Sequence, residues 1–396
     1  MEERRSRIGL VGIKGLYMGS AGASQELDAK VIKTGLCTLC GACVGACPYM
    51  VAHEGRVVVR DVCDLPQGRC QAFCPRISLD LDRLSNVAFG VPYSDDELGT
   101  VIRVVMARTT DATIKAKAQD SGAVTALISF AIEEGLIDSA VLTGFEDKSW
   151  PRGVIASSSK QALQCSGSSY LAAPTVESYH QAVQDMNCRS VGFVGTPCQV
   201  MALVKMRAAP PEMVQGMDKL KLVVGLFCTW ALAYPDFGSF LRKRVSDPVV
   251  KYEVPPHPAD ALFAFTEKER ISFPMDEVLP FVRPACRLCL DLTAEFADIS
   301  VGGGRGEVLH WNTLLIRTEK GRRLVDSAVK KGVLEIAPIP EANLSRLKAA
   351  AYNKKKRAIG NIIQRTKSTD DLLYLEGRPG IIKRLIAEDT VKFYEK

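Results

Sequence analysis

Cys37-Thr-Leu-Cys40-Gly-Ala-Cys43-Val-Gly-Ala-Cys47-Pro48 is the stretch of this sequence that says most about its fold. The spacing C-x2-C-x2-C-x3-C-P lets three thiolates on one tight loop bind three irons of a [4Fe–4S] cubane, while the fourth cysteine reaches a neighbouring cluster. Zinc is the alternative, but zinc takes two pairs of ligands around one ion and explains neither the third cysteine nor the proline. The stretch therefore predicts an iron–sulfur domain.

A second, less regular group of cysteines follows at Cys63, Cys70 and Cys74-Pro75. It keeps the C-x3-C-P ending but has one cysteine fewer than a full copy. Sharing of ligands between two clusters divides the seven thiolates into two sets: Cys37, Cys40, Cys43 and Cys74, and then Cys47, Cys63 and Cys70. The second set has three thiolates, so Asp64 as a fourth ligand, a cluster lacking one iron, and no second cluster all remain open. We favour a second cluster.

The composition is that of a globular chain. With 396 residues and 47% hydrophobic content, it can bury a sizeable core in two or three domains. No apolar run reaches the eighteen or so residues of a membrane span, and the opening MEERRSR lacks the apolar stretch of a secretory signal. We expect a cytoplasmic protein with reduced cysteines. The formal charge of +6 favours anionic cofactors weakly, and nucleic acid is not expected because no basic stripe with interleaved aromatics occurs.

The pattern along the chain predicts four segments. Residues 1–34 are expected to be a mobile arm or docking strap, 35–88 a ferredoxin-like α+β domain, 89–340 a mixed α/β core, and 341–396 a C-terminal helical segment. In the core, strand-like runs at 101–107, 139–143, 190–194 and 221–227 are separated by helical patterns such as 123–134. This alternation favours a mixed α/β sheet.

Four further cysteines fall near the predicted ends of core strands or in a C-x2-C pair: Cys198, Cys228, Cys286 and Cys289. Residues at the carboxyl ends of neighbouring strands converge on one crevice, so four thiolates could meet there. The alternative, equally consistent with spacing, is that Cys198 and Cys228 are small buried hydrophobes. Cys165 and Cys188 are expected to be structural.

Six stretches resemble the family of beta subunits of coenzyme F420 hydrogenases and dehydrogenases, in the family's order: residues 119–127, 167–170, 195–199, 286–291, 297–303 and 353–358. The resemblance implies a flavin-binding α/β core that holds FAD, coenzyme F420 and a [4Fe–4S] cluster. It makes the four core cysteines the preferred ligands of that cluster. Two departures, Ser121 and Ser169, replace a glycine and a cation of the family's pattern, so NAD(P)H is an alternative to F420.

The expected cofactor contacts combine this resemblance with local pattern: Asp120, Ser121, Gly122, Thr125, Gly167, Ser168, Tyr170, Gly195, Thr196, Gly303, Arg305 and Lys354. Ser121 and Gly122 precede a helical run whose free N–H groups suit a phosphate, although a helix cap explains them equally. The glycine run 302–306 suits a phosphate nest with Arg305 as counter-charge. The basic run 354–357 is usually a solvated face; it could instead meet the acidic tail of F420 or an acidic partner.

The resemblance implies an oxidoreductase that exchanges a hydride with F420 at FAD and passes single electrons through two or three [4Fe–4S] clusters. The partner would be a catalytic subunit of formate dehydrogenase, hydrogenase or heterodisulfide reductase type. The alternatives are a stand-alone ferredoxin-dependent flavin and iron–sulfur reductase of an organic substrate, and a cluster-only electron-transfer subunit. No side chain stands out as a catalytic base, because in such chemistry the protein mainly positions and tunes its cofactors.

Overall fold

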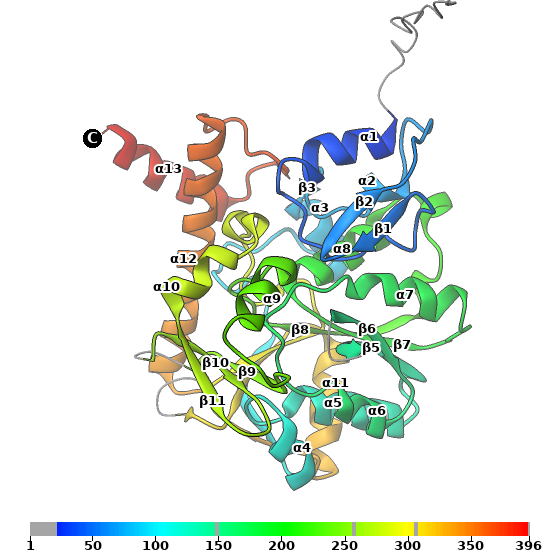
Figure 1. Cartoon of the computed structure of the whole chain (residues 1–396), viewed down its shortest axis with the longest axis vertical. Helices are drawn as coiled ribbons and strands as arrows, with labels where there is room; N and C mark the ends of the chain where they lie inside the picture. The colour runs from blue at the N-terminus through cyan, green and yellow to red at the C-terminus, as the bar shows by residue number, and fades with distance from the viewer. Residues whose placement is uncertain (1–21, 147–149, 256–258, 305–307, 395–396) are drawn as a thin grey trace, which may run out of the picture.

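The computed structural model describes residues 22–146, 150–255, 259–304 and 308–394. Its centre is an eight-stranded mixed sheet of order β14-β4-β13-β12-β8-β7-β5-β6 (Figure 1). The strands are β4 (Arg103–Thr109), β5 (Ser139–Glu146), β6 (Trp150–Ala156), β7 (Val191–Gly195), β8 (Leu220–Leu226), β12 (Ile299–Gly303), β13 (Asn312–Ile316) and β14 (Leu334–Ala337). The predicted mixed α/β core is confirmed, and each strand-like run of the sequence overlaps an observed strand.

Strands β5, β7, β8 and β12 are neighbours and run parallel, whereas β13 is antiparallel to β12 and β4 is antiparallel to β13. The carboxyl ends of β4, β12, β8, β7 and β5 therefore lie at one edge of the sheet. Ligand sites of open α/β sheets form at this edge.

Helices cover both faces of the sheet, as Figure 1 shows. On β8, Leu222 and Val224 pack with α5 (Ala123–Glu133), α6 (Ser159–Gln164) and α11 (Glu319–Lys330). Val223, which points to the opposite face, packs with α7 (Thr175–Gln184) and α8 (Pro197–Ala208). The alternation follows from the two-residue period of a strand. Every residue of β7 is buried, as expected for a strand covered on both faces.

The N-terminal part joins small elements around the cysteine loops: α1 (Ala23–Leu27), the π-helical turn η1 (Asp28–Ile32), the hairpin β1 (Met50–His53) and β2 (Arg56–Val59), α2 (Arg69–Ala72), β3 (Leu79–Asp80) and α3 (Leu81–Phe89). Residues 1–21 of the predicted arm lie outside the described residues. Ala23, Leu27 and Val31 are buried, so α1 and η1 are packed, which is the behaviour of the expected docking strap and not of the expected mobile arm.

A smaller unit and the C-terminal segment complete the fold. The three-stranded sheet β9 (Lys251–Glu253), β10 (Ala261–Phe265) and β11 (Arg270–Pro274) packs with α9 (Tyr234–Arg242) and α10 (Met275–Val278). The remaining short helices are α4 (Ala112–Lys117), η2 (Pro211–Met213), η3 (Met217–Lys219), η4 (Leu279–Phe281) and η5 (Pro284–Leu288). The C-terminal segment consists of α12 (Glu341–Thr366), β15 (Leu375–Glu376), which pairs with β3, and α13 (Gly380–Tyr394). Across the described ranges, no helix has both the length and the apolar character that a membrane crossing requires.

Candidate iron–sulfur and cofactor sites

The first predicted set of thiols gathers around Cys43. Burial raises the pKa of the Cys43 thiol well above its usual value, and the charges of Cys40, Cys37 and Cys74 raise it further. These three residues are the other members of the predicted set, although Cys74 is far from them in sequence. Thiols that oppose each other's ionisation in this way are stabilised as thiolates by positively charged metal. The set therefore fits a metal cluster.

The second predicted set gathers around Cys70. Burial raises the pKa of its thiol to about 12, and the charges of Cys47 and Cys63 contribute. Helix α1 packs against this set, because Ala23 N–H donates to Leu65 O at 2.8 Å and Cys63 N–H donates to Ser24 Oγ at 3.2 Å. The packed part of the N-terminal segment is thus the support of the second site. Cys63 is buried, whereas Asp64, one of the possibilities left open for the fourth ligand, is exposed.

The four core cysteines lie close enough for their charges to act on one another. Burial raises the pKa of the Cys228 thiol, and the charges of Cys286, Cys198 and Cys289 act in the same direction. Cys198 stands in the first turn of α8, where Thr196 and Gln199 form a capping box and Pro197 occupies the first turn. Hydrogen bonds reach the sulfurs from Ala231 N–H to Cys286 at 3.3 Å and between Thr196 Oγ1 and Cys198 at 3.4 Å; such bonds tune cluster potentials.

Within the described part of the chain, no three His, Cys, Asp or Glu side chains converge closely enough to hold a single metal ion. A structural zinc draws its sulfur ligands to about 2.3 Å from one point. A cubane gives each thiolate its own iron corner, so the sulfurs stay farther apart.

The three sets form a row. The charges of Cys74 and of Cys198 both raise the pKa of the Cys40 thiol, after burial, so the first set borders the core set. Burial raises the pKa of the Cys198 thiol, and Thr38, which lies in the first cysteine loop, opposes that rise. At the other end, the charge of Cys74 acts on Cys70 of the second set. The order is core set, first set, second set.

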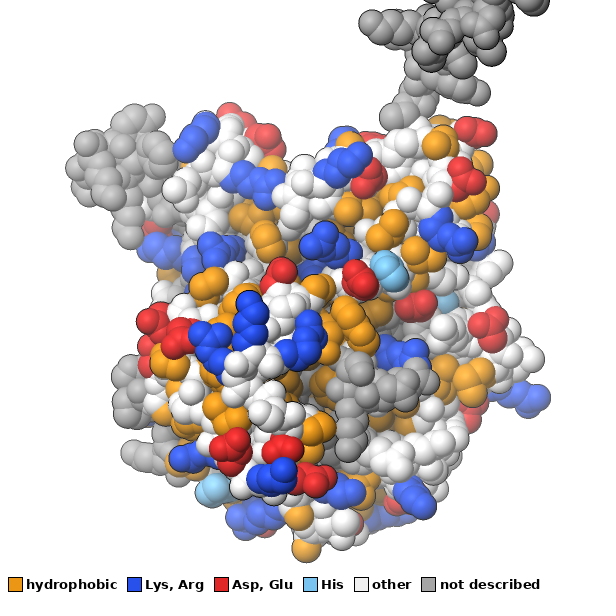
Figure 2. Space-filling view, viewed as in Figure 1, with side chains coloured by type: hydrophobic (Ala, Val, Ile, Leu, Met, Phe, Trp, Pro, Cys, Tyr) orange, Lys and Arg blue, Asp and Glu red, His pale blue; other side chains and the backbone are white. Residues whose placement is uncertain are grey.

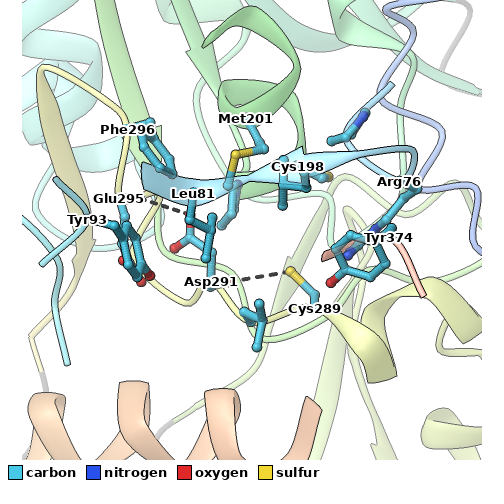
Figure 3. Close-up of a pocket in the computed structure, with 14 residues that line it drawn as sticks. Arg76, Leu81, Tyr93, Cys198, Met201, Cys289, Asp291, Glu295, Phe296 and Tyr374 are labelled. Atoms are coloured by element: carbon cyan, nitrogen blue, oxygen red, sulfur yellow. Dashed lines mark hydrogen bonds between the residues drawn. The ribbon is translucent and has the colours of Figure 1, made fainter. Parts of the chain in front are cut away.

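Two buried cations face the core set. Lys354 is 4% exposed and donates to Cys228 O; burial lowers its pKa, but the charges of Cys289 and Cys228 raise it above its usual value. Arg76 lies beside Cys289 and Cys198 (Figure 3). Burial raises the pKa of Cys289, but the charges of Lys354 and Arg76 bring it below its usual value.

Only part of the basic run 354–357 forms the solvated face that such a run usually forms: Lys356 is half-buried and Arg357 is exposed. Lys354 and Lys355 are buried, and Lys355 pairs with Glu295. The sequence predicts that Lys354 contacts a flavin or F420; in the structure it lies against the core cysteines. Arg76 was missed by sequence reasoning, although a cation directly after a Cys-Pro ending was available as a signal.

Several predicted cofactor contacts lie at the carboxyl edge of the parallel strands. Gly195 and Thr196 follow β7, and Gly303 ends β12 with Asp120 beside it, 2.9 Å from the position that a Cβ on Gly303 would take. Ser121 Oγ lies 2.9 Å from Ala107 O and 2.6 Å from Asn312 Oδ1. Residues from separate stretches of the family pattern thus meet at this edge.

The N-terminus of α5 is closed by a residue that sequence reasoning missed. Ala123 N–H donates to Asn312 Oδ1 at 3.2 Å, and Asn312 Nδ2 donates to Gly302 O. Gly122 precedes the helix with φ +76°, and a Cβ there would lie 2.7 Å from Ile114 Cγ2. The helix-cap alternative thus describes the observed contacts at this position, and a cofactor contact of Ser121 and Gly122 stays a prediction.

The loop 166–170 lies beside the first turn of α5. Thr125 Oγ1 and Ser166 Oγ are 2.9 Å apart. Gly167 has φ +108° and no atom within 4 Å of the position of a Cβ, so its backbone, next to the half-buried Ser168, faces open space. Tyr170 accepts a hydrogen bond from Val254 N–H at 3.2 Å. Arg305 lies outside the described residues.

A mixed α/β core with four convergent cysteines, joined to a ferredoxin-type segment, defines an iron–sulfur electron-transfer protein. Two family models match the chain: that of the N-terminal part of the coenzyme F420 hydrogenase/dehydrogenase beta subunit over residues 104–179, and that of its C-terminal part over 188–342. A 4Fe-4S binding domain model matches residues 30–51. The chain belongs to the family of coenzyme F420 hydrogenase/dehydrogenase beta subunits, which are oxidoreductases.

Relatives and a solved structure agree with this assignment. The coenzyme F420 hydrogenase subunit beta of Methanothermobacter thermautotrophicus is 31% identical over 68% of this chain and 96% of its own length. An F420H2 dehydrogenase subunit of Methanosarcina mazei is 27% identical over 83% of this chain and 92% of its own. A chain of the F420-reducing [NiFe] hydrogenase complex from Methanosarcina barkeri is similar with a TM-score of 0.63 and 30% identity, over 69% of this chain and 96% of that chain.

Proposed function

We propose that this chain is the electron-transfer subunit of an F420-dependent oxidoreductase complex, in which a hydride is exchanged between F420 and FAD in the core and single electrons pass through three iron–sulfur clusters to or from a catalytic partner. The observation that carries the proposal is the row of thiol sets. Cys198 of the core set borders Cys40 of the first set, and Cys70 of the second set borders Cys74 of the first. Such a row supports stepwise transfer of electrons.

The carboxyl edge of the sheet fits a flavin. Gly167 presents backbone to open space beside the hydroxyls of Thr125 and Ser166, and glycine is the residue that permits such close approach to a phosphate. FAD bound there would exchange two electrons as a hydride and pass them on singly. The chain's own residues would hold the cofactor against the core set, whose Cys198 stands two residues after Thr196 at the same edge.

Exposed apolar side chains flank the second set, which therefore suits a partner. Val62 and Leu65, on either side of Cys63 and Asp64, are 64% and 60% exposed, and Tyr49 and Val58 are also exposed. Figure 2 shows apolar side chains among charged ones over these N-terminal elements. Exposed apolar side chains around a redox site are what a docking partner buries. The partner in this proposal is a formate dehydrogenase, hydrogenase or heterodisulfide-reductase-type subunit.

The test is anaerobic purification of the intact complex, with iron, sulfide and flavin counted, followed by separate mixing with reduced F420 and with NADH. Reduction of the bound flavin by reduced F420 and transfer of the electrons to the N-terminal clusters, seen by absorbance and electron paramagnetic resonance, are expected. In Cys286→Ser the flavin should still be reduced while the N-terminal clusters stay oxidised. Cys165→Ser, at a half-buried cysteine outside the three sets, is the matched control and should behave as wild type.

The outcomes separate the alternatives. Clusters without FAD would leave a cluster-only subunit as the function. Reduction by NADH alone would overturn the F420 assignment. A purified protein that is complete without any catalytic partner and that reduces an organic substrate would favour the stand-alone reductase instead.

A further inference from the structure

Arg76 connects the first thiol set to the core set. It follows Cys74-Pro75, and its backbone N–H donates to Cys74 Sγ at 3.4 Å. Its guanidinium extends in the other direction and donates to Leu288 O at 3.4 Å and to Ala285 O at 3.3 Å. These carbonyls belong to the loop that holds Cys286 and Cys289. One residue thus contacts a ligand of the first set and the ligand loop of the core set.

The guanidinium is directed at the core thiols. Arg76 is 5% exposed, lies 4.4 Å from the Tyr374 ring centroid, and is near enough to Cys289 and Cys198 for their charges to act on it. Figure 3 shows its side chain beside Tyr374 at a small cavity that Cys198 and Cys289 also line. Its Nε is buried without a hydrogen-bond partner in the described part of the structure. The charge is therefore neither exposed to solvent nor fully bonded within the protein.

A buried cation in this position has a defined effect on a cluster. One-electron reduction adds a negative charge to the cluster, breaks no bond and leaves the arginine protonated. The nearby positive charge stabilises the reduced form, most strongly where water is excluded. Net charge and hydrogen bonds to the sulfurs are among the terms that set cluster potentials.

We propose that Arg76 sets the reduction potential of the core cluster and holds it above the value it would otherwise have, from a position fixed by the neighbouring N-terminal cluster loop. This positioning role deepens the proposed function and rests on it. Lys205 supplies the matching cation on the other side: it donates to Ile77 O and to Ser78 O, and its charge acts on Cys74 more strongly than that of Arg76. Lys205 thus acts mainly on the first N-terminal cluster, and Arg76 acts mainly on the core cluster.

The experiment is a dithionite titration of the intact complex with redox mediators, in which electron paramagnetic resonance follows each cluster and iron is counted for each variant. Arg76→Gln should lower the equilibrium constant for one-electron reduction of the core cluster at least tenfold, which is about 59 mV. The shift of the first N-terminal cluster should be smaller, because the backbone N–H to Cys74 is retained. Lys205→Met should show the reverse pattern.

Two further variants control for structure. Arg287→Gln removes an exposed arginine that lies between Cys286 and Cys289, and solvent screening should leave the core potential unchanged. Arg76→Lys keeps the charge and should keep most of the potential. Arg76→Met replaces Arg76→Gln in the comparison if the latter lacks its full iron content.

The outcomes are distinct. A core potential that stays unchanged in an iron-replete Arg76→Gln or Arg76→Met protein overturns the inference. A shift of the core potential in Arg76→Lys as large as that in Arg76→Gln overturns it as well. Absence of core iron or flavin from the wild-type complex overturns the proposed function instead. Iron content and potential are read separately, so the two failures cannot be confused.

Discussion

Lys355 and Glu295 form an ion pair whose removal should cost much of the stability of the core. Their side chains are 0% and 2% exposed. Lys355 Nζ also donates to Glu97 O at 3.0 Å, and Tyr93 donates to the second Glu295 oxygen at 2.6 Å. The pair ties α12, which carries Lys354 to the core cysteines, to the loop that follows Cys289.

The expected cost of Lys355→Met follows from the charge left behind. Removing one partner of a buried ion pair typically costs about 3–5 kcal/mol because the other charge remains uncompensated. Tyr93 still bonds Glu295, so we expect about 3 kcal/mol. Burial raises the pKa of Glu295, and Lys355 is the strongest influence that lowers it. Without Lys355 the raised pKa of Glu295 favours its protonation in the folded form. The folded variant therefore binds more protons than the unfolded chain, so it should lose stability as pH rises and be less stable at about pH 8 than at about pH 6.

The assay is anaerobic urea unfolding of the protein, followed by circular dichroism. Lys356→Met is the matched control, since Lys356 is the next residue of α12 and pairs with Glu388 at 30% and 35% exposure; its cost should stay below about 1 kcal/mol. Lys355→Met combined with Glu295→Gln should recover at least half of the loss. The uncompensated charge is refuted as the cause if Lys355→Met costs no more than Lys356→Met, or if the double variant is no more stable than the single one.

Three other results are expected. Gly122→Ala, at φ +76° and against Ile114 Cγ2, should lower the free energy of unfolding by about 3 kcal/mol. Gly135→Ala, at φ +66° in open space, should lower it by about 1 kcal/mol. Equal unfolding midpoints of the two variants would contradict this. Burial lowers the pKa of His180 to about 4. As the pH falls, the unfolded state therefore binds the proton before the folded state does, and the free energy of unfolding should fall by about 2 kcal/mol from about pH 7.5 to 5. His180→Phe should flatten that dependence in thermal melts. Asp64→Ala should keep the iron count and spectra of wild type, since Asp64 is exposed; lost iron would make it a ligand.

The sequence alone determined the parts of this protein that depend on neighbouring residues. Cys37, Cys40 and Cys43 belong to one loop, and their spacing predicts their chemistry without knowledge of the rest of the chain. The strand and helix pattern of the core is likewise local, since hydrophobic periodicity within each segment fixes its type. The grouping of Cys74 with the first set also followed from the motif, because shared ligands are part of that pattern.

Only the tertiary structure decided what surrounds these cysteines. The parallel order of β7, β8 and β12 brings Cys198, Cys228 and the 286–289 loop together. Their spacing in the sequence was equally consistent with Cys198 and Cys228 being small buried hydrophobic residues. The run at Lys354 and Lys355 has the sequence of a solvated helix face. It is buried because its counter-charges, Glu295 and the core thiols, arrive from segments far along the chain. A cation can leave water only when such partners surround it, and their arrival is a property of the fold and not of the local sequence.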